Sequence, residues 1–254
     1  FTLELGISGA AIASSLAEMG SLIVLCLYTK AKIDKEKYGL KPVYDGQLLI
    51  KVLNLSVWSM LHAFISVAPW FLFFVAIEHL GKTELAISNI TRSVSAIFFV
   101  IANSFAVTTG SLVSNAIGAR GRKELFPICH KVLKLGYAVG FPLVGIALLC
   151  NRWIVSFYTD NELLVELAFA PFVVMLLNYT FALPGYVYLN AVGGTGKTKI
   201  TFMFQVTTTC VYLVYLYWLS FCIKASLSLY LTAEYLFVIL LALQSIIHLK
   251  SKHY

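Results

Sequence analysis

Long apolar runs alternate with short polar connections along the whole chain. The runs lack the strict alternation of apolar and polar residues that marks a half-buried strand, and each reaches the roughly 20 residues that a helix needs to cross a bilayer. The pattern therefore predicts an all-α protein, a polytopic membrane bundle of about seven transmembrane helices. We expect these helices at about residues 5–28, 52–78, 85–117, 128–150, 163–192, 200–222 and 227–249.

The third run is unusually polar for a helix in lipid. Between residues 85 and 117 it has no proline and one charge, Arg92, and as a helix it would extend about 50 Å against a hydrocarbon core of about 30 Å. Small and polar residues at this density are typical of a helix that packs in a bundle or lines a wet cavity. The polar positions are Asn89, Thr91, Ser93, Ser95, Asn103, Ser104, Thr108, Thr109, Ser111, Ser114 and Asn115.

Composition supports a membrane protein. Hydrophobic residues make up 59% of the chain and charged residues 12%, whereas a soluble domain carries about 25% charged residues. The net charge of +7 does not indicate a nucleic-acid partner, because the basic residues lie in short loops between apolar runs. The five cysteines form no C-x-x-C pair, and most lie in or beside apolar runs, as small buried hydrophobes do.

Lysine and arginine gather in alternate connections. Fifteen of them lie in one set of connections and at the C-terminus, and the other set holds Lys82, Arg152 and Lys224. Because basic loops stay on the cytoplasmic side, we expect a multi-pass protein of the cell (inner or plasma) membrane with a cytoplasmic C-terminus. The chain starts at Phe1 rather than Met and shows no signal-peptide pattern, so we expect a fragment.

Four ionisable residues fall within the predicted spans: Glu18, His62, Arg92 and Glu234. A charge at the bilayer centre costs on the order of 2.5–3.5 kcal/mol on insertion scales, so each needs a partner or a function. Arg92 would either snorkel outward or pair with a carboxylate or a substrate. Glu18 and Glu234 would either bind H⁺ or Na⁺ or stay neutral through burial and a hydrogen bond. His62 is typical of a satisfied polar contact.

Two other motifs point to functions that the context disfavours. Residues 191–198 (AVGGTGKT) fit a relaxed phosphate-loop pattern, but apolar spans flank them where a phosphate loop needs a strand before it and a helix after it. We expect a tight turn there and no nucleotide. A seven-helix receptor is disfavoured because the last span lacks a lysine for retinal and an N-P-x-x-Y sequence. With no nucleophile–base pair and no metal cluster, we expect neither an enzyme nor a cofactor.

Several stretches, in order and at matching spacing, resemble the multidrug and toxic compound extrusion (MATE) family of cation-coupled efflux transporters. The resemblance covers the whole chain. The stretches are residues 6–13 (GISGAAIA), 71–81 (FLFFVAIEHLG) with 85–90 (LAISNI), 112–118 (LVSNAIG), and 156–160 (SFYTD) with 189–196 (LNAVGGTG).

The resemblance implies twelve helices in two six-helix lobes related by pseudo-two-fold symmetry. Residues 1–28 would be helix six, the end of the N-terminal lobe; residues 29–51 the cytoplasmic linker; and residues 52–254 the six-helix C-terminal lobe. Some members carry acidic coupling residues in helices seven and ten. Those places fall on Ser66 and Ala182 here, so coupling would use the missing N-terminal lobe or Glu234.

The resemblance thus implies part of a H⁺- or Na⁺-coupled multidrug efflux antiporter that works by alternating access. Its partners would be the lipid bilayer, small organic cationic or aromatic substrates and the missing N-terminal lobe. The alternative within the superfamily is a flippase for lipid-linked oligosaccharides, which a cavity rich in Arg and Lys would favour; a non-transporting receptor or channel is a third class. Candidates for the substrate and ion pathway are Asn89, Arg92, Asn103, Asn178 and Glu234.

Overall fold

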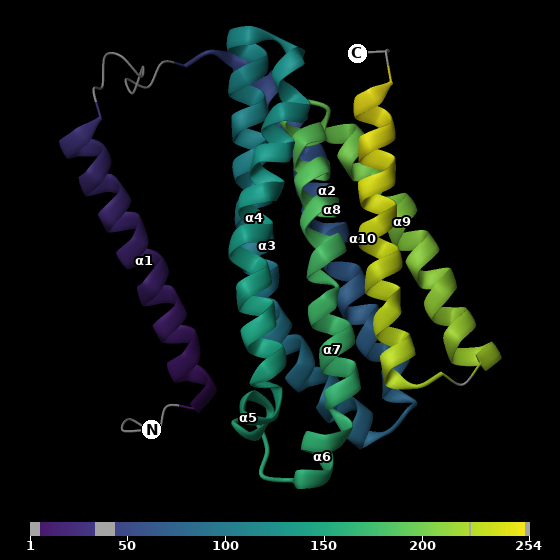
Figure 1. The fold of residues 1–254 in the computed structure, drawn as a ribbon. Coiled ribbons are helices and arrows are strands. Elements are labelled where there is room, and N and C mark those ends of the chain that lie inside the picture. The colour runs from purple at the N-terminus through teal and green to yellow at the C-terminus, as the bar shows by residue number, and fades with distance from the viewer. Residues whose placement is uncertain (1–5, 34–43, 224, 252–254) are drawn as a thin grey trace. The chain divides into compact units, whose positions relative to one another are not determined.

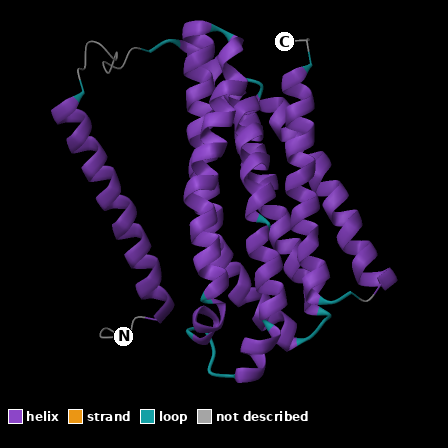
Figure 2. Cartoon of the chain, viewed as in Figure 1, coloured by secondary structure: helices purple, strands orange, loops and turns teal. Residues whose placement is uncertain are grey.

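The described part of the chain is helical throughout. A computed structural model describes residues 6–33, 44–223 and 225–251, and every regular element in these ranges is a helix (Figure 2). The chain divides into two compact units, Phe1–Ile50 and Lys51–Tyr254.

Seven helices or helix runs of the described residues are long and apolar enough to cross a membrane, which confirms the predicted all-α bundle. They are joined by short elements, the 3₁₀ turn η1 (Arg122–Glu124) and helix α5 (Asn151–Ser156). The spans are α1 (Gly6–Lys32), α2 (Gly46–Glu78), α3 (Lys82–Arg120), α4 (Leu125–Leu149), α6 (Glu162–Leu167) with α7 (Phe169–Leu177) and α8 (Tyr179–Gly194), α9 (Thr198–Trp218) with the π-helix η2 (Leu219–Ile223), and α10 (Leu227–Lys250).

The helices on either side of the predicted linker extend into it. Helix α1 continues to Lys32, and α2 begins at Gly46 because Asp45 caps it, its Oδ1 accepting from the amides of Gln47 and Leu48 at 3.0 and 3.1 Å. Hydropathy marks where an apolar run ends, whereas a helix continues until its end groups are satisfied. Of the predicted linker 29–51, residues 34–43 lie outside the described residues.

The fifth span is broken where the sequence predicted one helix over residues 163–192. It consists of α6, α7 and α8, which meet at Ala168 and Asn178. Pro171 explains the first break: proline has no amide hydrogen, so it fits the first turn of a helix, where amides lack intrahelical partners. Pro171 is the third residue of α7, in the first turn after Ala168.

Helix α8 lies at the centre of the second unit and packs against α3, α4, α9 and α10 (Figure 1). Its backbone comes very close to two of these helices. A Cβ atom built on Gly185 would lie 2.7 Å from the carbonyl oxygen of Val238 in α10, and one on Gly194 would lie 2.4 Å from that of Gly110 in α3. Small residues at such contacts are how helices associate in lipid, where burying apolar surface provides no driving force.

Two tyrosines join α4 to α8. Pro184 cannot donate to the carbonyl of Thr180, four residues earlier, and the Tyr137 hydroxyl donates to that oxygen instead, at 2.7 Å. In the opposite direction the Tyr179 hydroxyl donates to the carbonyl of Gly136 at 2.9 Å. A lipid-embedded helix tolerates proline when a neighbour satisfies the carbonyl that it frees, so Tyr137 stabilises the proline-containing span.

Glycine is required in α4 where Tyr179 crosses it, which gives a test of this packing. A Cβ on Gly140 would lie 2.2 Å from the Tyr179 ring, whereas one on Gly145 in the same helix would meet nothing within 4 Å. We expect Gly140→Ala to lower the free energy of unfolding by about 1–3 kcal/mol through overpacking. Gly145→Ala should raise it by up to about 1 kcal/mol, since alanine is the better helix former.

Unfolding followed by tryptophan fluorescence in detergent would measure both changes. Equal effects of the two substitutions would contradict the close approach of α4 and α8.

Candidate functional site

A buried ion pair joins α3 to α10. Nη2 of Arg92 lies 2.5 Å from Oε1 of Glu234, and the two side chains are 8% and 17% exposed. Arg92 lies about 15 Å from the start of α3 and Glu234 about 10 Å from the start of α10, at 1.5 Å per residue. Of the two alternatives for Arg92, the structure therefore supports pairing with a carboxylate over snorkelling.

Two further helices complete the surroundings of the pair. The Tyr212 hydroxyl of α9 donates to the same Oε1 of Glu234 at 3.1 Å. From α2, the rings of Phe73 and Phe74 face the guanidinium, whose Cζ lies 4.0 and 5.4 Å from their centroids. The aromatic faces attract the cation and exclude water. Four helices thus converge on one charge pair.

The balance of energies makes this pair sensitive to its charge state. Two unit charges about 4 Å apart attract by about 4 kcal/mol at an effective dielectric constant of 20, and removing each ion from water costs several kcal/mol. The intact pair therefore contributes little net stability. Neutralising one partner leaves the other charge buried and uncompensated, which is strongly unfavourable.

The structure brings together Arg92 and Glu234 of the five predicted site residues. Asn89 and Asn103 are exposed on α3, and Asn178 is buried at the junction of α7 and α8. Among the described residues no hydrogen bond links these asparagines to the ion pair, and Oδ1 of Asn178 has no hydrogen-bond partner. The asparagines and the ion pair are therefore separate features of the bundle.

The exposed polar residues of α3 form a stripe along one side of the helix, called here the α3 stripe. Its hydroxyls include those of Ser93 and Ser104, which donate to the helix carbonyls of Asn89 and Val100 at 2.8 Å. Even so, its amides and hydroxyls remain a polar surface on a helix long enough to span a membrane. The stripe comprises Asn89, Ser93, Asn103, Ser104, Thr108, Ser111, Ser114 and Asn115.

The remaining sequence candidates take no part in the hydrogen bonds of the ion pair. Glu18 is exposed on α1, and His62 is half-buried on α2. Ser66 is exposed, with its hydroxyl donating to the Ala63 carbonyl at 2.8 Å, and Ala182 is half-buried on α8. The two positions at which the resemblance would place acidic residues therefore offer no carboxylate here.

The predicted turn lies within residues 191–198, at 195–197. Helix α8 ends at Gly194, Gly196 adopts a φ of +82°, and α9 begins at Thr198. The amide of Gly196 donates to the Gly193 carbonyl at 2.9 Å. The segment is a short turn between two helices, and it lacks the preceding strand that a phosphate loop follows.

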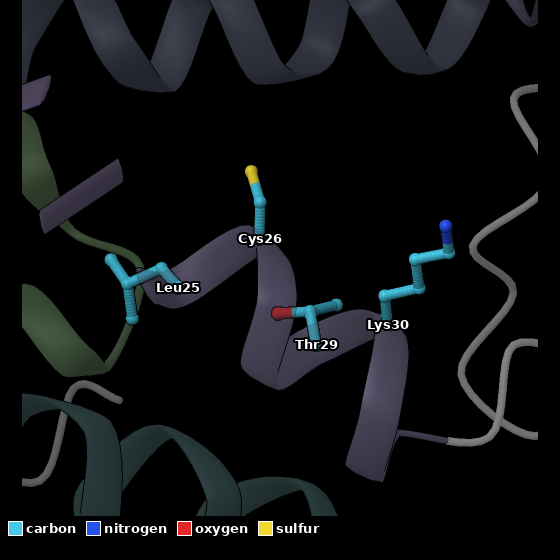
Figure 3. A pocket seen from close by; sticks show the side chains of 4 residues that line it. All are labelled: Leu25, Cys26, Thr29 and Lys30. Carbon is cyan, nitrogen blue, oxygen red and sulfur yellow. The ribbon is translucent and has the colours of Figure 1, made fainter. Parts of the chain in front are cut away.

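Hollows on the surface do not coincide with the ion pair. One lies on α1 and is lined by Leu25, Cys26, Thr29 and Lys30, which Figure 3 shows on one stretch of the helix. A second is an apolar groove of about 470 Å³ between α2 and the end of α9, where His79 and Ser220 lie among aliphatic and aromatic side chains. Among the described residues no group of three or more His, Cys, Asp or Glu could hold a metal ion.

Sequence reasoning missed the partners of the ion pair. Phe73 and Phe74 stand in an apolar run, and Tyr212 stands among several aromatic residues of its span. The paired aromatics near the end of α2 were the one available signal, since aromatic faces are common partners of intramembrane cations. The hydrophobic periodicity of one helix does not reveal which residues of another helix its side chains contact.

Removing one charge of the pair should destabilise the protein far more than removing an exposed charge. We expect Glu234→Ala to lower the free energy of unfolding by about 3–5 kcal/mol, because Arg92 stays buried without a counter-charge. Arg152 and Glu166 provide the control, since their side chains lie 3.6 Å apart and are 77% and 68% exposed. Glu166→Ala should cost less than about 1 kcal/mol.

Both variants would be compared by their unfolding in detergent. The double substitution Arg92→Met with Glu234→Leu should recover much of the loss, because an apolar pair needs no compensation. A single variant as stable as Glu166→Ala would contradict the buried pair.

Comparison with solved structures supports the fold. A MATE protein crystallised in complex with MaL6 matches 97% of this chain and 56% of its own, with 18% identity and a TM-score of 0.77. A MATE protein in a bent conformation matches 77% of this chain and 44% of its own, with 18% identity and a TM-score of 0.67. A MOP superfamily transporter from Pyrococcus furiosus matches 78% of this chain and 43% of its own, with 17% identity and a TM-score of 0.65.

The chain spans about half the length of these solved structures. A search of the curated proteins returned no match. The family model MatE matches residues 59–219, which is more than half of the chain. Together with the seven spans, this match makes the protein a multi-pass membrane protein of a transporter family rather than an enzyme. The chain belongs to the MatE family.

Proposed function

We propose that this chain is the C-terminal part of a cation-coupled multidrug efflux antiporter that works by alternating access. In this proposal residues 1–28 are helix six of the N-terminal lobe, residues 29–51 the cytoplasmic linker, and residues 52–254 the six-helix C-terminal lobe. The match over residues 59–219 and the coverage of about half of the solved chains support this division.

The α3 stripe is the observation that carries the proposal. Exposed side-chain amides on a membrane-spanning helix are unfavourable against lipid, where no water satisfies them, and the hydroxyls of the stripe add to the polar surface. They are favourable on the wall of a water-filled cavity. We therefore place Asn89 and Asn103 on the cavity wall of the C-terminal lobe, opposite a wall that the N-terminal lobe supplies.

Alternating access follows from such a two-walled cavity. In transporters of two related halves, the substrate lies between the halves, which rock so that the cavity opens to one side and then to the other. Ion binding drives this cycle if the ion has different affinities for the two states. Arg92, Asn178 and Glu234 are the remaining candidates for the ion and substrate pathway.

The substrates in this proposal are small organic compounds, cationic or aromatic. One of the similar structures, at 17% identity and a TM-score of 0.65, is of a multidrug resistance MATE family transporter. A flippase for lipid-linked oligosaccharides needs free cations to bind the pyrophosphate of its cargo. Arg92 is neutralised by Glu234 at 2.5 Å, so it does not favour that alternative.

Transport of ethidium by the full-length protein tests the proposal. Cells that make it should lose ethidium faster than vector controls, and the chain alone should not transport because one lobe makes one wall. We expect Asn103→Leu in the α3 stripe to slow efflux at least threefold by making the cavity wall apolar. Thr207→Val is the control, since Thr207 is exposed on α9 and its hydroxyl donates to the Met203 carbonyl.

Confirmed expression with no difference from vector controls would reject the transport proposal. Equal efflux by Asn103→Leu and the wild type would reject the place of the α3 stripe in the cavity.

Cysteine labelling tests the orientation of the chain in the membrane. We propose that the C-terminus is cytoplasmic, which puts Asp160 outside and Ser251 inside; both are exposed. In a protein whose native cysteines are replaced, a membrane-impermeant maleimide applied to intact cells should label Asp160→Cys and not Ser251→Cys. Permeabilised cells should label both, and the reverse pattern in intact cells would invert the topology.

A further inference from the structure

The carboxylate of Glu234 is occupied on one oxygen and available on the other. Oε1 accepts from Arg92 of α3 and Tyr212 of α9, and no described residue donates to Oε2. Tyr186 of α8 is a further described titratable group that interacts electrostatically with both charges. From α2 the neighbours are the rings of Phe73 and Phe74. A ligand of Glu234 must therefore bind beside a fixed positive charge.

This environment distinguishes between the two candidate ions. Arg92 repels either cation, so the difference lies in the ligands. A hard metal cation such as Na⁺ requires several oxygen ligands arranged around it, and Oε1 of Glu234 is already occupied by Arg92 at 2.5 Å. The Tyr212 hydroxyl directs its hydrogen toward the same oxygen. A proton needs a single lone pair, which Oε2 provides.

We infer that Glu234, paired with Arg92 and Tyr212, is the coupling-ion site of this transporter and that the ion is H⁺ rather than Na⁺. The inference rests on the proposed function as a cation-coupled antiporter. It assigns coupling to α3 and α10, whereas Ser66 and Ala182 leave α2 and α8 without an acid at the places that some MATE proteins use.

Proton binding forms one O–H bond on Glu234 and removes its negative charge. A proton from the outer aqueous phase adds to Oε2, the carboxylate becomes a neutral carboxyl, and Arg92 loses its counter-charge. When the site opens to the other side the proton leaves to water and the ion pair re-forms, so the site returns to its starting state. A buried, unpaired guanidinium is unstable, and Arg92 must move away from Glu234 while the proton is bound.

Helix α2 is the element that this movement reaches. The Phe73 ring lies 4.0 Å from the guanidinium carbon, so a shift of Arg92 changes the contact between α3 and α2. Pro69 lies one turn earlier in α2 and cannot donate to the Ile65 carbonyl, which weakens the helix at that point. Proton binding on α10 is thereby linked to bending of α2.

Ethidium transport by the purified full-length protein in proteoliposomes tests the choice of ion. We expect a pH gradient without Na⁺ to drive uphill transport, and a Na⁺ gradient at uniform pH to leave it at the level of protein-free liposomes. Transport driven by Na⁺ alone would overturn the inference and leave the proposed function intact. Absence of transport under either gradient would remove both.

Variants of Glu234 test whether this residue couples proton binding to transport. Glu234→Gln keeps the size and polarity of a protonated carboxyl but cannot take up or release a proton, so we expect pH-driven uphill transport to fall at least tenfold. Glu166→Gln, which changes the exposed Arg152 pair, should keep wild-type uphill transport. Uphill transport retained by Glu234→Gln would overturn the inference.

Glu234→Asp covers the case in which Glu234→Gln does not fold. It keeps a titratable carboxyl one methylene shorter, and we expect it to retain measurable pH-driven transport. Proton release on ethidium binding is the second measurement, followed with a pH-sensitive dye in weakly buffered detergent. The wild type and Glu166→Gln should release protons, and equal release by folded Glu234→Gln would overturn the assignment.

Discussion

Hydrocarbon provides no solvent for charge or for an unpaired carbonyl, so each such group in this bundle needs a partner from another helix. Glu234 of α10 meets this requirement for Arg92 of α3, and Tyr137 of α4 meets it for the carbonyl that Pro184 leaves without a donor. Both contacts hold helices together at particular positions along their length. Polar satisfaction therefore aligns these helices, in addition to stabilising them.

Close packing around α8 makes the ion pair possible. Gly194 brings α8 against α3, and Gly185 brings it against α10, with backbone atoms in direct contact. Because both partner helices rest on the same central helix, Arg92 and Glu234 come within 2.5 Å of each other. A larger residue at either glycine would place its Cβ against a carbonyl oxygen of the neighbouring helix.

Helix α2 is attached in a different way, through side chains. Phe73 faces the Arg92 guanidinium, Trp58 contacts Phe202 with ring centroids 5.6 Å apart, and the Thr198 hydroxyl donates to the Leu55 carbonyl at 3.2 Å. Side chains can change rotamers, whereas touching backbones cannot separate without losing their packing. The bundle thus combines a rigid centre at α8 with a more adjustable α2, as alternating access in the proposed transporter would require.

The sequence by itself determined the number of spans and the helical class, because hydropathy and span length are local properties, and the order and spacing of its short motifs carried the MATE resemblance. It also identified Arg92 and Glu234 as residues in need of a partner. Tertiary structure decided that they are each other's partner across 142 positions, that Tyr212 and Phe73 surround them, and that the fifth span is broken. Such contacts depend on how separate helices pack, which the periodicity of one helix does not encode.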